Sequence, residues 1–541
     1  MKHKLTTLFT AIALICCSCF NTVVANELTL PEKLSLPAQT IEPQSFNAGS
    51  TTDQLVISAS YPWFGVVGGR VTIPASEVQS VKLWLEPNFS TTERRGVISV
   101  TKTSDGTTTT IPVIQPPYFT SVTNGFPARL ETKNSSNDGW ESNGIATPAN
   151  SSAVLSAVSA SGKRLAFTED GGLEISDTQV GDYFIYAVPV ENLAAGEQID
   201  IMCTMVAMES SSPKYWVVEY WDNDRWNTID GDLRVAEEDK NIEYSFYNKY
   251  FKSAHHTSYA QSFTLANPVV NNTVKVRLRI LSEGGGATKL SGGQYTSLSL
   301  VRHNNAPAII DTKRVLFIGN SFTYFFGTPF MFKEIARSQG HQVDAVISVK
   351  GGQEFSEHLR LERSNEAITR GGYDIAFLQD TSPNPAIYAD TGNPDILNAS
   401  REINKLTFKH SPNCQIVYER TWACPHNNYR TYGSYDKLDY LLKKGTEMLK
   451  KELKQDKIIV SPVGLGFRIG REHNLPLLHT DNRHQSRVGA YMKACINYLF
   501  IYQTRFTDSV SDCGVDAKTA ALVRQIAEQV VFEGVKEKYN Y

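Results

Sequence analysis

A change of pattern at about residue 311 constrains the fold of this chain more than any other feature. Before it, short runs rich in Val, Ile, Ser and Thr are separated by turn residues at the spacing of β-strands. After it, short apolar runs alternate with stretches of helical periodicity. The first pattern predicts β-sandwiches, and the second predicts a parallel sheet covered by helices on both faces.

The C-terminal region, residues 311–541, is predicted to be an α/β/α three-layer sandwich. Helices are expected from Thr328 to Gly340, with Pro at the first helical turn, and from Tyr435 to Lys454. Reactive side chains of such a sheet belong on loops that follow the carboxyl ends of its strands. The five apolar runs read as parallel strands are Val315 to Ile318, Val343 to Val349, Tyr373 to Leu378, Gln415 to Tyr418 and Lys457 to Val460.

The region before residue 311 is predicted to form two β-sandwich domains. A chain of 541 residues is too long for a single hydrophobic core. The linker-like Gln115-Pro116-Pro117 divides the region into domains over residues 30–116 and 117–305. We expect the α/β region to be independent of these two domains in a chain that begins near Asn305.

The N-terminus has the pattern of an export signal. A basic start is followed by an apolar run from Leu5 to Cys17, which is short for a membrane span. Small residues before position 26 predict cleavage after Ala25, so that residues 1–25 are a signal peptide, and no later segment is long and apolar enough to span a membrane. The alternative is a lipoprotein anchored through Cys17 or Cys19. We expect an exported protein, periplasmic, secreted or attached to the cell surface.

Charge and cysteine content exclude several classes of protein. The 53 basic and 56 acidic residues give a net charge of -3, which offers no broad basic surface for nucleic acid. Cleavage at Ala25 leaves an odd number of cysteines, which leaves one or two disulfides open and matches no zinc-site spacing. These residues are Cys203, Cys414, Cys424, Cys495 and Cys513.

Three residues in two distant segments form a candidate catalytic group. Ser321 directly follows the first predicted strand, in VLFIGNSFT. A serine hydroxyl is a weak nucleophile and needs a base that a third group orients. Asp481 and His484 follow the fifth strand, in HTDNRHQS, where one loop can place the carboxylate against one imidazole nitrogen while the other nitrogen faces Ser321. Each segment alone is a common capping sequence, but the topology predicts both at one edge of the sheet.

The segments GNSFT and DNRH, at opposite ends of residues 311–541, resemble the first and last motif blocks of the SGNH/GDSL hydrolase superfamily. The resemblance implies a flavodoxin-like hydrolase fold with Ser321 as nucleophile, His484 as base and Asp481 as its orienting group. It also implies that the amide of Ser321 contributes to an oxyanion hole.

Two further oxyanion donors are implied by the same resemblance. Gly352, in VISVKGGQEF, matches the family's glycine block, with Gly351 as the alternative. The family's Gly-x-Asn-Asp block is replaced here by FLQD, so Gln379 is expected to take the role of the asparagine. A strand-end hydrogen bond is the other interpretation of Gln379.

Two residues after the fourth strand, in ERTWACPHNN, are candidates for substrate binding. An aromatic ring such as Trp422 can stack on a sugar or line an acyl pocket, although it fits a core position equally well. His426 is expected on the same rim.

The N-terminal domain carries the features that suggest a substrate. The run TTERRGVISVTKTSDGTTTTIPVIQ, with Trp63 upstream, resembles a BACON domain, an immunoglobulin-like module that often precedes catalytic domains in carbohydrate-degrading proteins of gut Bacteroidetes. The segment YWVVEYWDNDRW resembles a hairpin of galactose-binding-like jelly rolls. An exported esterase joined to a BACON-like module resembles the accessory esterases of glycan-degrading systems, which implies removal of O-acetyl or other small acyl groups from an acylated polysaccharide or oligosaccharide. Such acyl transfer requires neither a metal nor an organic cofactor.

Three other interpretations stay open at this point. One is an esterase or lipase that acts on non-carbohydrate esters. Another is a glycan-binding protein whose hydrolase domain is degenerate, as the replacement at Gln379 would suggest. The third is a metal-dependent hydrolase with His479, Asp481 and His484 as ligands.

Overall fold

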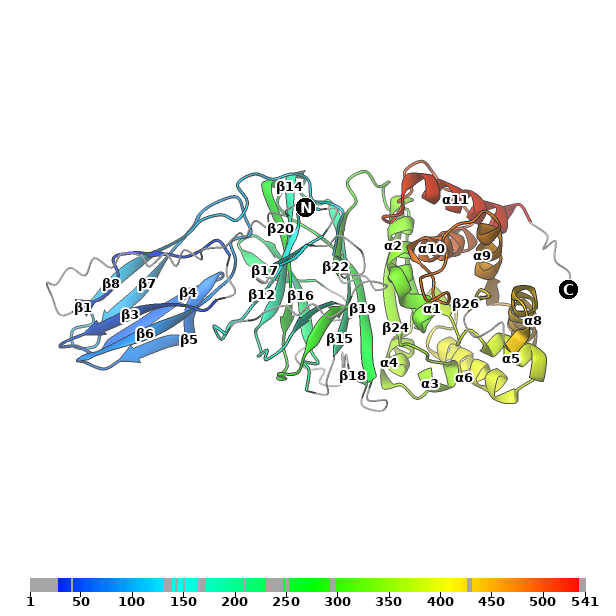
Figure 1. The fold of residues 1–541 in the computed structure, drawn as a ribbon, viewed down its shortest axis with the longest axis horizontal. Helices are drawn as coiled ribbons and strands as arrows, with labels where there is room; N and C mark the ends of the chain where they lie inside the picture. The colour runs from blue at the N-terminus through cyan, green and yellow to red at the C-terminus, as the bar shows by residue number, and fades with distance from the viewer. Residues whose placement is uncertain are drawn as a thin grey trace, which may run out of the picture.

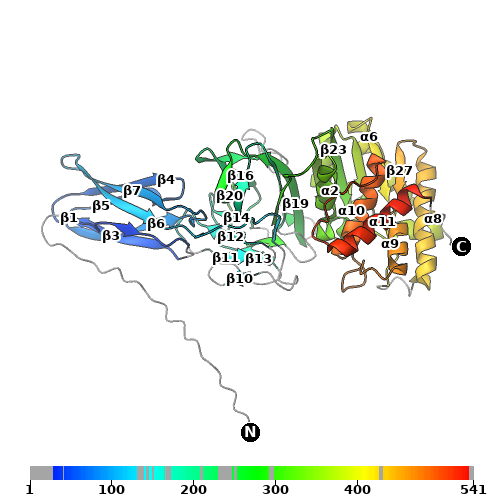
Figure 2. The ribbon, with the colours of Figure 1, turned by 90° about the horizontal axis from the view of Figure 1, so that it is seen from above.

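Three domains lie in a row along the molecule, as Figure 1 and, from above, Figure 2 show. The computed structural model describes residues 28–39, 42–130, 139–141, 145–148, 151–163, 165, 172–207, 211–229, 247–248, 253–291, 298–425 and 431–534. The predicted signal peptide, with Cys17 and Cys19, lies outside the described residues.

The first domain consists of β-strands that share one core. Their hydrogen-bonded order is β1-β3-β6-β5-β4-β7-β8-β2. Leu55 and Ile57 alternate with less buried neighbours, as expected for a strand with one face in a core. The strands are β1 (Leu28–Thr29), β2 (Leu34–Ser35), β3 (Gln44–Ser50), β4 (Leu55–Tyr61), β5 (Phe64–Ile73), β6 (Glu77–Leu85), β7 (Arg94–Lys102) and β8 (Thr108–Gln115).

The second domain contains two sheets that enclose a common hydrophobic core, with Phe184 and Tyr186 from one sheet and Ile199 and Ile201 from the other. One sheet has the order β10 (Gly139–Glu141), β11 (Ile145–Thr147), β12 (Val154–Val158), β14 (Tyr183–Leu193), β20 (Val269–Ile280), β16 (Trp216–Asp222) and β17 (Arg225–Thr228). The other has the order β13 (Gly172–Ile175), β21 (Thr288–Ser291), β15 (Gln198–Ala207), β19 (Ser253–Thr264) and β18 (Tyr247–Asn248), and β22 (Leu298–Arg302) joins β15 to β9 (Ala128–Leu130). The hairpin predicted from YWVVEYWDNDRW is confirmed as β16 and β17.

The third domain is built on a parallel sheet of five strands in the order β24-β23-β25-β26-β27. All five strands predicted from the apolar runs are confirmed. The strand order reverses at β23, because the strands on both of its sides come later in the chain. Ligands of such sheets bind where the strand order reverses. The strands are β23 (Asp311–Gly319), β24 (His341–Val349), β25 (Ile375–Leu378), β26 (Gln415–Glu419) and β27 (Ile458–Ser461).

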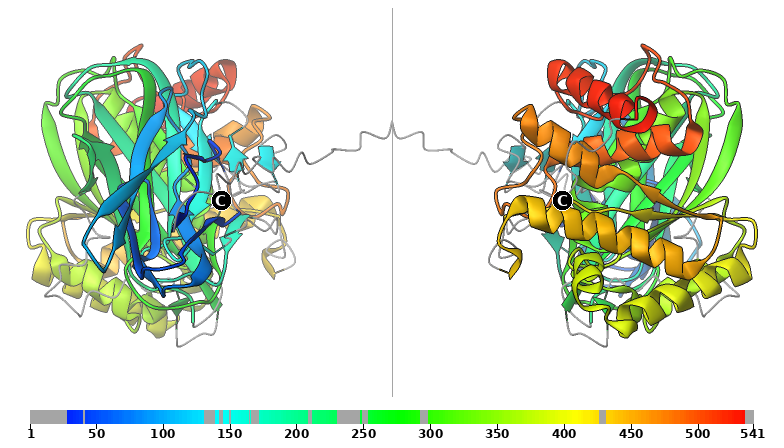
Figure 3. Two further views of the ribbon diagram at one scale, coloured as in Figure 1. Left: turned by 90° about the vertical axis from the view of Figure 1, so that its left-hand side faces the viewer. Right: turned by 90° about the vertical axis from the view of Figure 1, so that its right-hand side faces the viewer.

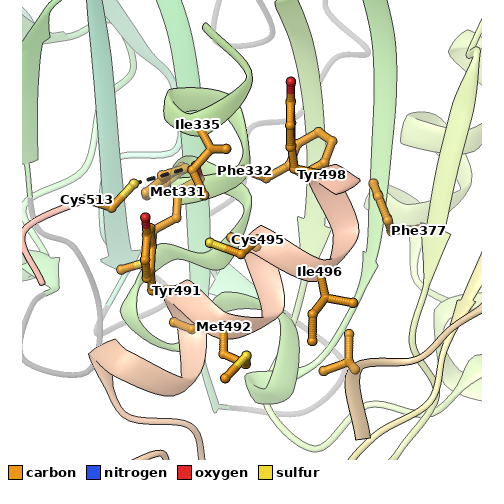
Figure 4. Packing of buried hydrophobic residues seen from close by; sticks show 14 of the residues in the cluster. Met331, Phe332, Ile335, Phe377, Tyr491, Met492, Cys495, Ile496, Tyr498 and Cys513 are labelled. Carbon is orange, nitrogen blue, oxygen red and sulfur yellow. Dashed lines mark hydrogen bonds between the residues drawn. The ribbon is translucent and has the colours of Figure 1, made fainter. Parts of the chain in front are cut away.

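Helices cover both faces of this sheet, so its strands are apolar on both sides. Val315 and Phe317 of β23 belong to the core under one layer of helices, while Leu316 and Ile318 belong to the core under the other. The first layer contains α2 (Thr328–Ser338), α9 (Val463–Glu472), α10 (Arg487–Tyr502) and α11 (Ala517–Phe532), and Figure 4 shows side chains of α2 and α10 packed together. The second layer contains α4 (Glu362–Arg370), α6 (Pro394–His410) and α8 (Tyr435–Leu453), and Figure 3 shows the domain end-on in its right-hand view.

The second and third domains share a buried interface. Every residue of α2 is buried, including its polar side chains, because the second domain packs against this helix in addition to α10 and the sheet. Lys333 donates to Ser262 at 3.0 Å and lies 4.0 Å from the buried carboxylate of Asp200. Glu334 forms a 2.6 Å ion pair with Arg129. The expectation that the third domain is independent of the β region is therefore not supported by this interface.

The first domain also packs on the second. Phe89 of the first domain belongs to one apolar cluster with Phe119 and Ile185 of the second, and the hydroxyl of Tyr183 donates to Glu86 at 2.7 Å. Across the described residues, no helix has the length and apolarity needed to cross a bilayer. The five cysteines after residue 25 are buried and described, and the structure forms none of the disulfides that the sequence left open between them.

Candidate active site

The segment around Ser321 forms a tight turn from the end of β23 into the short helix α1 (Ser321–Tyr324). Asn320 caps this helix, and its side-chain oxygen accepts a hydrogen bond from the amide of Phe322 at 3.1 Å. At Gly319 an added Cβ would lie 2.3 Å from Oγ1 of Thr323, so the turn requires glycine here. The turn therefore places Ser321 at the carboxyl edge of the sheet, where the topology predicts reactive groups.

Ser321, His484 and Asp481 form a continuous chain of hydrogen bonds. The loop between α9 and α10 brings Nε2 of His484 to 2.7 Å from Oγ of Ser321. Nδ1 of the same ring lies 2.6 Å from Oδ2 of Asp481. The other carboxylate oxygen accepts hydrogen bonds from the amides of Arg483 at 2.9 Å and His484 at 3.0 Å. The three predicted residues are thus brought together in the geometry of a nucleophile, a base and an orienting carboxylate.

The protonation of this group suits a base near neutral pH. Burial lowers the pKa of His484 below its ordinary value of 6.5, and the opposing effect of Asp481 is smaller. Burial would raise the pKa of Asp481, but hydrogen bonds from His484 and from the amide of Arg483 outweigh it and bring the pKa to about 2. A neutral imidazole and an ionised carboxylate can therefore coexist at pH 7.

Trp422 is not on the rim of the site, which corrects the prediction that it contacts substrate. It is 1% exposed and lies between the rings of Phe322, at 4.4 Å between centroids, and Phe467, at 4.1 Å, both nearly parallel to it. Its indole N–H donates to the carbonyl of Arg483 at 3.1 Å. Trp422 therefore supports both catalytic segments from the core. The other predicted rim residue, His426, lies outside the described residues.

The glycine turn after β24 is tied to the turn that carries Ser321. The amide of Lys350 donates to the carbonyl of Gly319 at 3.1 Å, and the side-chain amide of Asn320 donates to the carbonyl of Gln353 at 2.9 Å. Between these two bonds, Gly352 adopts a φ of +71°, is exposed, and has no atom within 4 Å of where a Cβ would lie. A substrate can therefore approach the backbone here.

Gln379 follows β25 and lies against the nucleophile turn with its side chain fully buried. Its Oε1 accepts hydrogen bonds from the amide of Asn320 at 3.1 Å and from the hydroxyl of Thr323 at 2.9 Å, while its Nε2 donates to the carbonyl of Asp380. These contacts fit the strand-end interpretation. They give no support to the predicted donation from Gln379 to an oxyanion.

The arrangement does not favour the metal-site interpretation of His479, Asp481 and His484. Both ring nitrogens of His484 are engaged, by Ser321 and Asp481, so neither is directed to a metal. His479 lies 3.9 Å from Asp481. Within the described part of the chain, no group of three or more His, Cys, Asp or Glu side chains could hold a metal ion.

Two contributions to the site were missed by the sequence reasoning. The ring of Phe325 stacks on the imidazole of His484. The side-chain amide of Gln485 donates to the carbonyls of Ser321 at 3.3 Å, Phe322 at 3.1 Å and Phe325 at 3.2 Å. The only signal in the sequence is that Gln485 directly follows His484. A glutamine beside a histidine is not a specific motif, so this signal does not predict the role.

Comparisons with known proteins give resemblances in structure. No protein-family model matches this chain, and no curated protein sequence matches it. A DUF4886 family protein from Bacteroides uniformis is 18% identical, with a TM-score of 0.35, and the match covers 41% of this chain and 96% of that one. A protein from Slackia heliotrinireducens, assigned as an SGNH hydrolase, is 21% identical, with a TM-score of 0.28 and coverage of 35% and 96%.

An acetyl xylan esterase from the rumen bacterium Butyrivibrio proteoclasticus is 11% identical, with a TM-score of 0.23 and coverage of 55% of this chain and 85% of its own. All three TM-scores lie below 0.5.

Proposed function

We propose that this protein is a serine esterase that hydrolyses small acyl esters through a covalent acyl-enzyme. The observation that carries the proposal is the chain of hydrogen bonds from Ser321 through His484 to Asp481. In this arrangement the hydroxyl, which is a weak nucleophile by itself, can lose its proton to the neighbouring imidazole as it attacks.

The reaction proceeds in two acyl transfers. Oγ of Ser321 attacks the ester carbonyl carbon and its proton moves to Nε2 of His484; the bond to the leaving alcohol then breaks, and the imidazolium returns the proton to that alcohol. Water next attacks the acyl-enzyme and gives its proton to His484. The carboxylic acid leaves, and Ser321 recovers its proton from the ring. Asp481 stabilises the imidazolium in both halves.

The oxyanion that forms in each half requires hydrogen-bond donors. We assign this role to the backbone amides of Ser321 and Gly352. The exposure and left-handed conformation of Gly352 support this assignment, because they leave its backbone accessible from the site. The side chain of Gln379 holds the turn instead, as its buried contacts indicate.

The proposed substrate is an O-acetylated polysaccharide or oligosaccharide outside the cell. This part of the proposal rests on the BACON-like sequence of the first domain and on the signal-like N-terminus. Incubation of a panel of acetylated glycans with the protein and with Ser321→Ala, followed by mass spectrometry, tests it. Loss of acetyl groups with the parent alone is expected. Hydrolysis of 4-nitrophenyl acetate without deacetylation of any glycan would support the proposed esterase activity and contradict the proposed glycan substrate.

A further inference from the structure

A buried ion pair lies beneath the nucleophile turn, away from the hydrogen-bonded triad. Lys493 of α10 and Glu419, the last residue of β26, are each 2% exposed at the side chain, and Nζ lies 2.8 Å from Oε2. The other oxygen of Glu419 accepts from the side-chain amide of Asn497 at 2.7 Å. Both charged groups are shielded from water, which costs solvation free energy. Their close contact offsets part of this cost.

The ammonium of Lys493 also reaches the segment that carries Ser321. Nζ donates to the backbone carbonyl of Phe322 at 2.8 Å. The carbonyls of a helix as short as α1 have few partners within the helix, because the chain leaves the helical path at Phe325 with ψ of 133°. Gln485 donates to the same carbonyl of Phe322 at 3.1 Å. Two side chains from the segment that carries His484 and from α10, Gln485 and Lys493, therefore bind the backbone of α1, which carries Ser321.

Gln485 and Lys493, the two donors to the carbonyl of Phe322, lie close to His484 along the chain. Ser486 caps α10 two residues after His484, so Gln485 and Lys493 are joined to the base through one short segment and the helix that follows. Any shift of α1 relative to α10 would change the 2.7 Å contact between Ser321 and His484. Glu419 fixes Lys493 in turn to the carboxyl edge of the sheet.

We propose that Lys493, with Glu419 as its counter-ion and Gln485 as a second donor, is a positioning residue that sets the register of Ser321 against His484. The inference rests on the proposed esterase function. It predicts that loss of the pair slows acylation of Ser321 more than it affects substrate binding, since a displacement of about 1 Å at a reacting group can lower a rate about 100-fold.

The test uses the double variant Lys493→Met/Glu419→Gln, which removes both charges together and leaves no buried ion unpaired. The full-length double variant should show a kcat for 4-nitrophenyl acetate lowered about 10- to 100-fold, with KM within about twofold. Labelling of Ser321 by an organophosphorus reagent should slow in parallel. As a control, Asp439→Asn removes another buried carboxylate, paired with Arg420 at 2.9 Å and Arg468 at 2.8 Å, and should leave kcat of the folded protein unchanged.

A folded double variant with kcat and labelling rate within twofold of the parent would overturn the positioning role. Should the double variant not fold, Gln485→Met decides the question, because it removes a neutral donor to the same carbonyl; a kcat lowered about tenfold supports the role, and an unchanged kcat overturns it. A parent whose Ser321 is neither labelled nor active overturns the esterase proposal itself, whereas a labelled parent with equally labelled variants overturns only the positioning role.

Discussion

The ring of Phe325 lies nearly parallel to the imidazole of His484, with centroids 4.0 Å apart and planes at 17°. Phe325 is buried, so it shields one face of the base from water, and burial is the main cause of the lowered pKa of His484. The hydrophobic contact thus favours the neutral form of the ring, which is the form that accepts a proton from Ser321.

The pH dependence of activity should report this contact. Only neutral imidazole is active, so kcat/KM should rise with pH through a midpoint below 6.5, and activity should be lost as the pH falls through the folded-state pKa. Phe325→Ala admits water and should move the midpoint upward, toward 6.5. Phe355→Leu, on the opposite side of the sheet, is the control and should leave it unchanged. A midpoint that does not move in Phe325→Ala would show that the ring does not set the pKa.

Trp422 should matter for stability and for the geometry of the base. Trp422→Ala removes a fully buried ring and is expected to lower the free energy of unfolding by about 3 to 5 kcal/mol. Trp422→Phe retains an aromatic ring but leaves the carbonyl of Arg483 without its indole donor, so a smaller loss of stability and a lower kcat are expected. Denaturant unfolding and steady-state kinetics measure both. If either variant instead showed a raised KM for an acetylated oligosaccharide at unchanged stability, Trp422 would contact substrate at the rim of the site.

Gln379→Ala distinguishes support of the turn from oxyanion binding. The substitution removes the acceptor for Asn320 and Thr323 from a buried site, so the free energy of unfolding should fall by about 1 to 3 kcal/mol. The folded fraction should keep kcat within about tenfold, since a missing oxyanion donor typically costs 100-fold or more. A loss of about 100- to 1,000-fold in kcat with unchanged stability would show that Gln379 donates to the oxyanion.

The interface between the second and third domains makes a prediction about truncation. A chain beginning near residue 305 would uncover the side of α2 that faces the second domain and would deprive Glu334 of Arg129, so it should aggregate or lose activity. A chain beginning near residue 117 retains this interface and is the matched comparison, expected to stay soluble and active. Size-exclusion chromatography and ester hydrolysis measure the outcome. A soluble, active chain from residue 305 would show that the interface is dispensable.

The parts of the fold that sequence could predict are those whose cause is local. The strands of the third domain are buried on both faces and therefore stand out as apolar runs, and Ser321 follows from the chemistry expected at a strand end. Asp481 and His484 lie in the loop between α9 and α10, and they were predictable from their spacing and from the base that a serine nucleophile needs. Trp422 could not be placed, because an aromatic residue after a strand suits a core and a rim equally.

Long-range contacts escaped prediction for a different reason. The polar residues of α2, such as Lys333 and Glu334, have the pattern of a solvent-exposed face until another domain is known to cover it. Lys493 and Glu419 lie far apart in the chain, and neither segment signals that they meet beneath Ser321. Such pairs depend on the tertiary arrangement, which periodicity does not encode.

If Ser321 is the nucleophile, its replacement should abolish catalysis, which is measured as kcat/KM for 4-nitrophenyl acetate in the parent and in Ser321→Ala. The substitution removes a single oxygen from a small side chain, so the thermal midpoint should stay close to that of the parent. Loss of a triad member is expected to lower kcat/KM by about 10⁴-fold or more. A folded Ser321→Ala protein that keeps more than about a tenth of the parent activity, far above that expectation, would contradict the assignment.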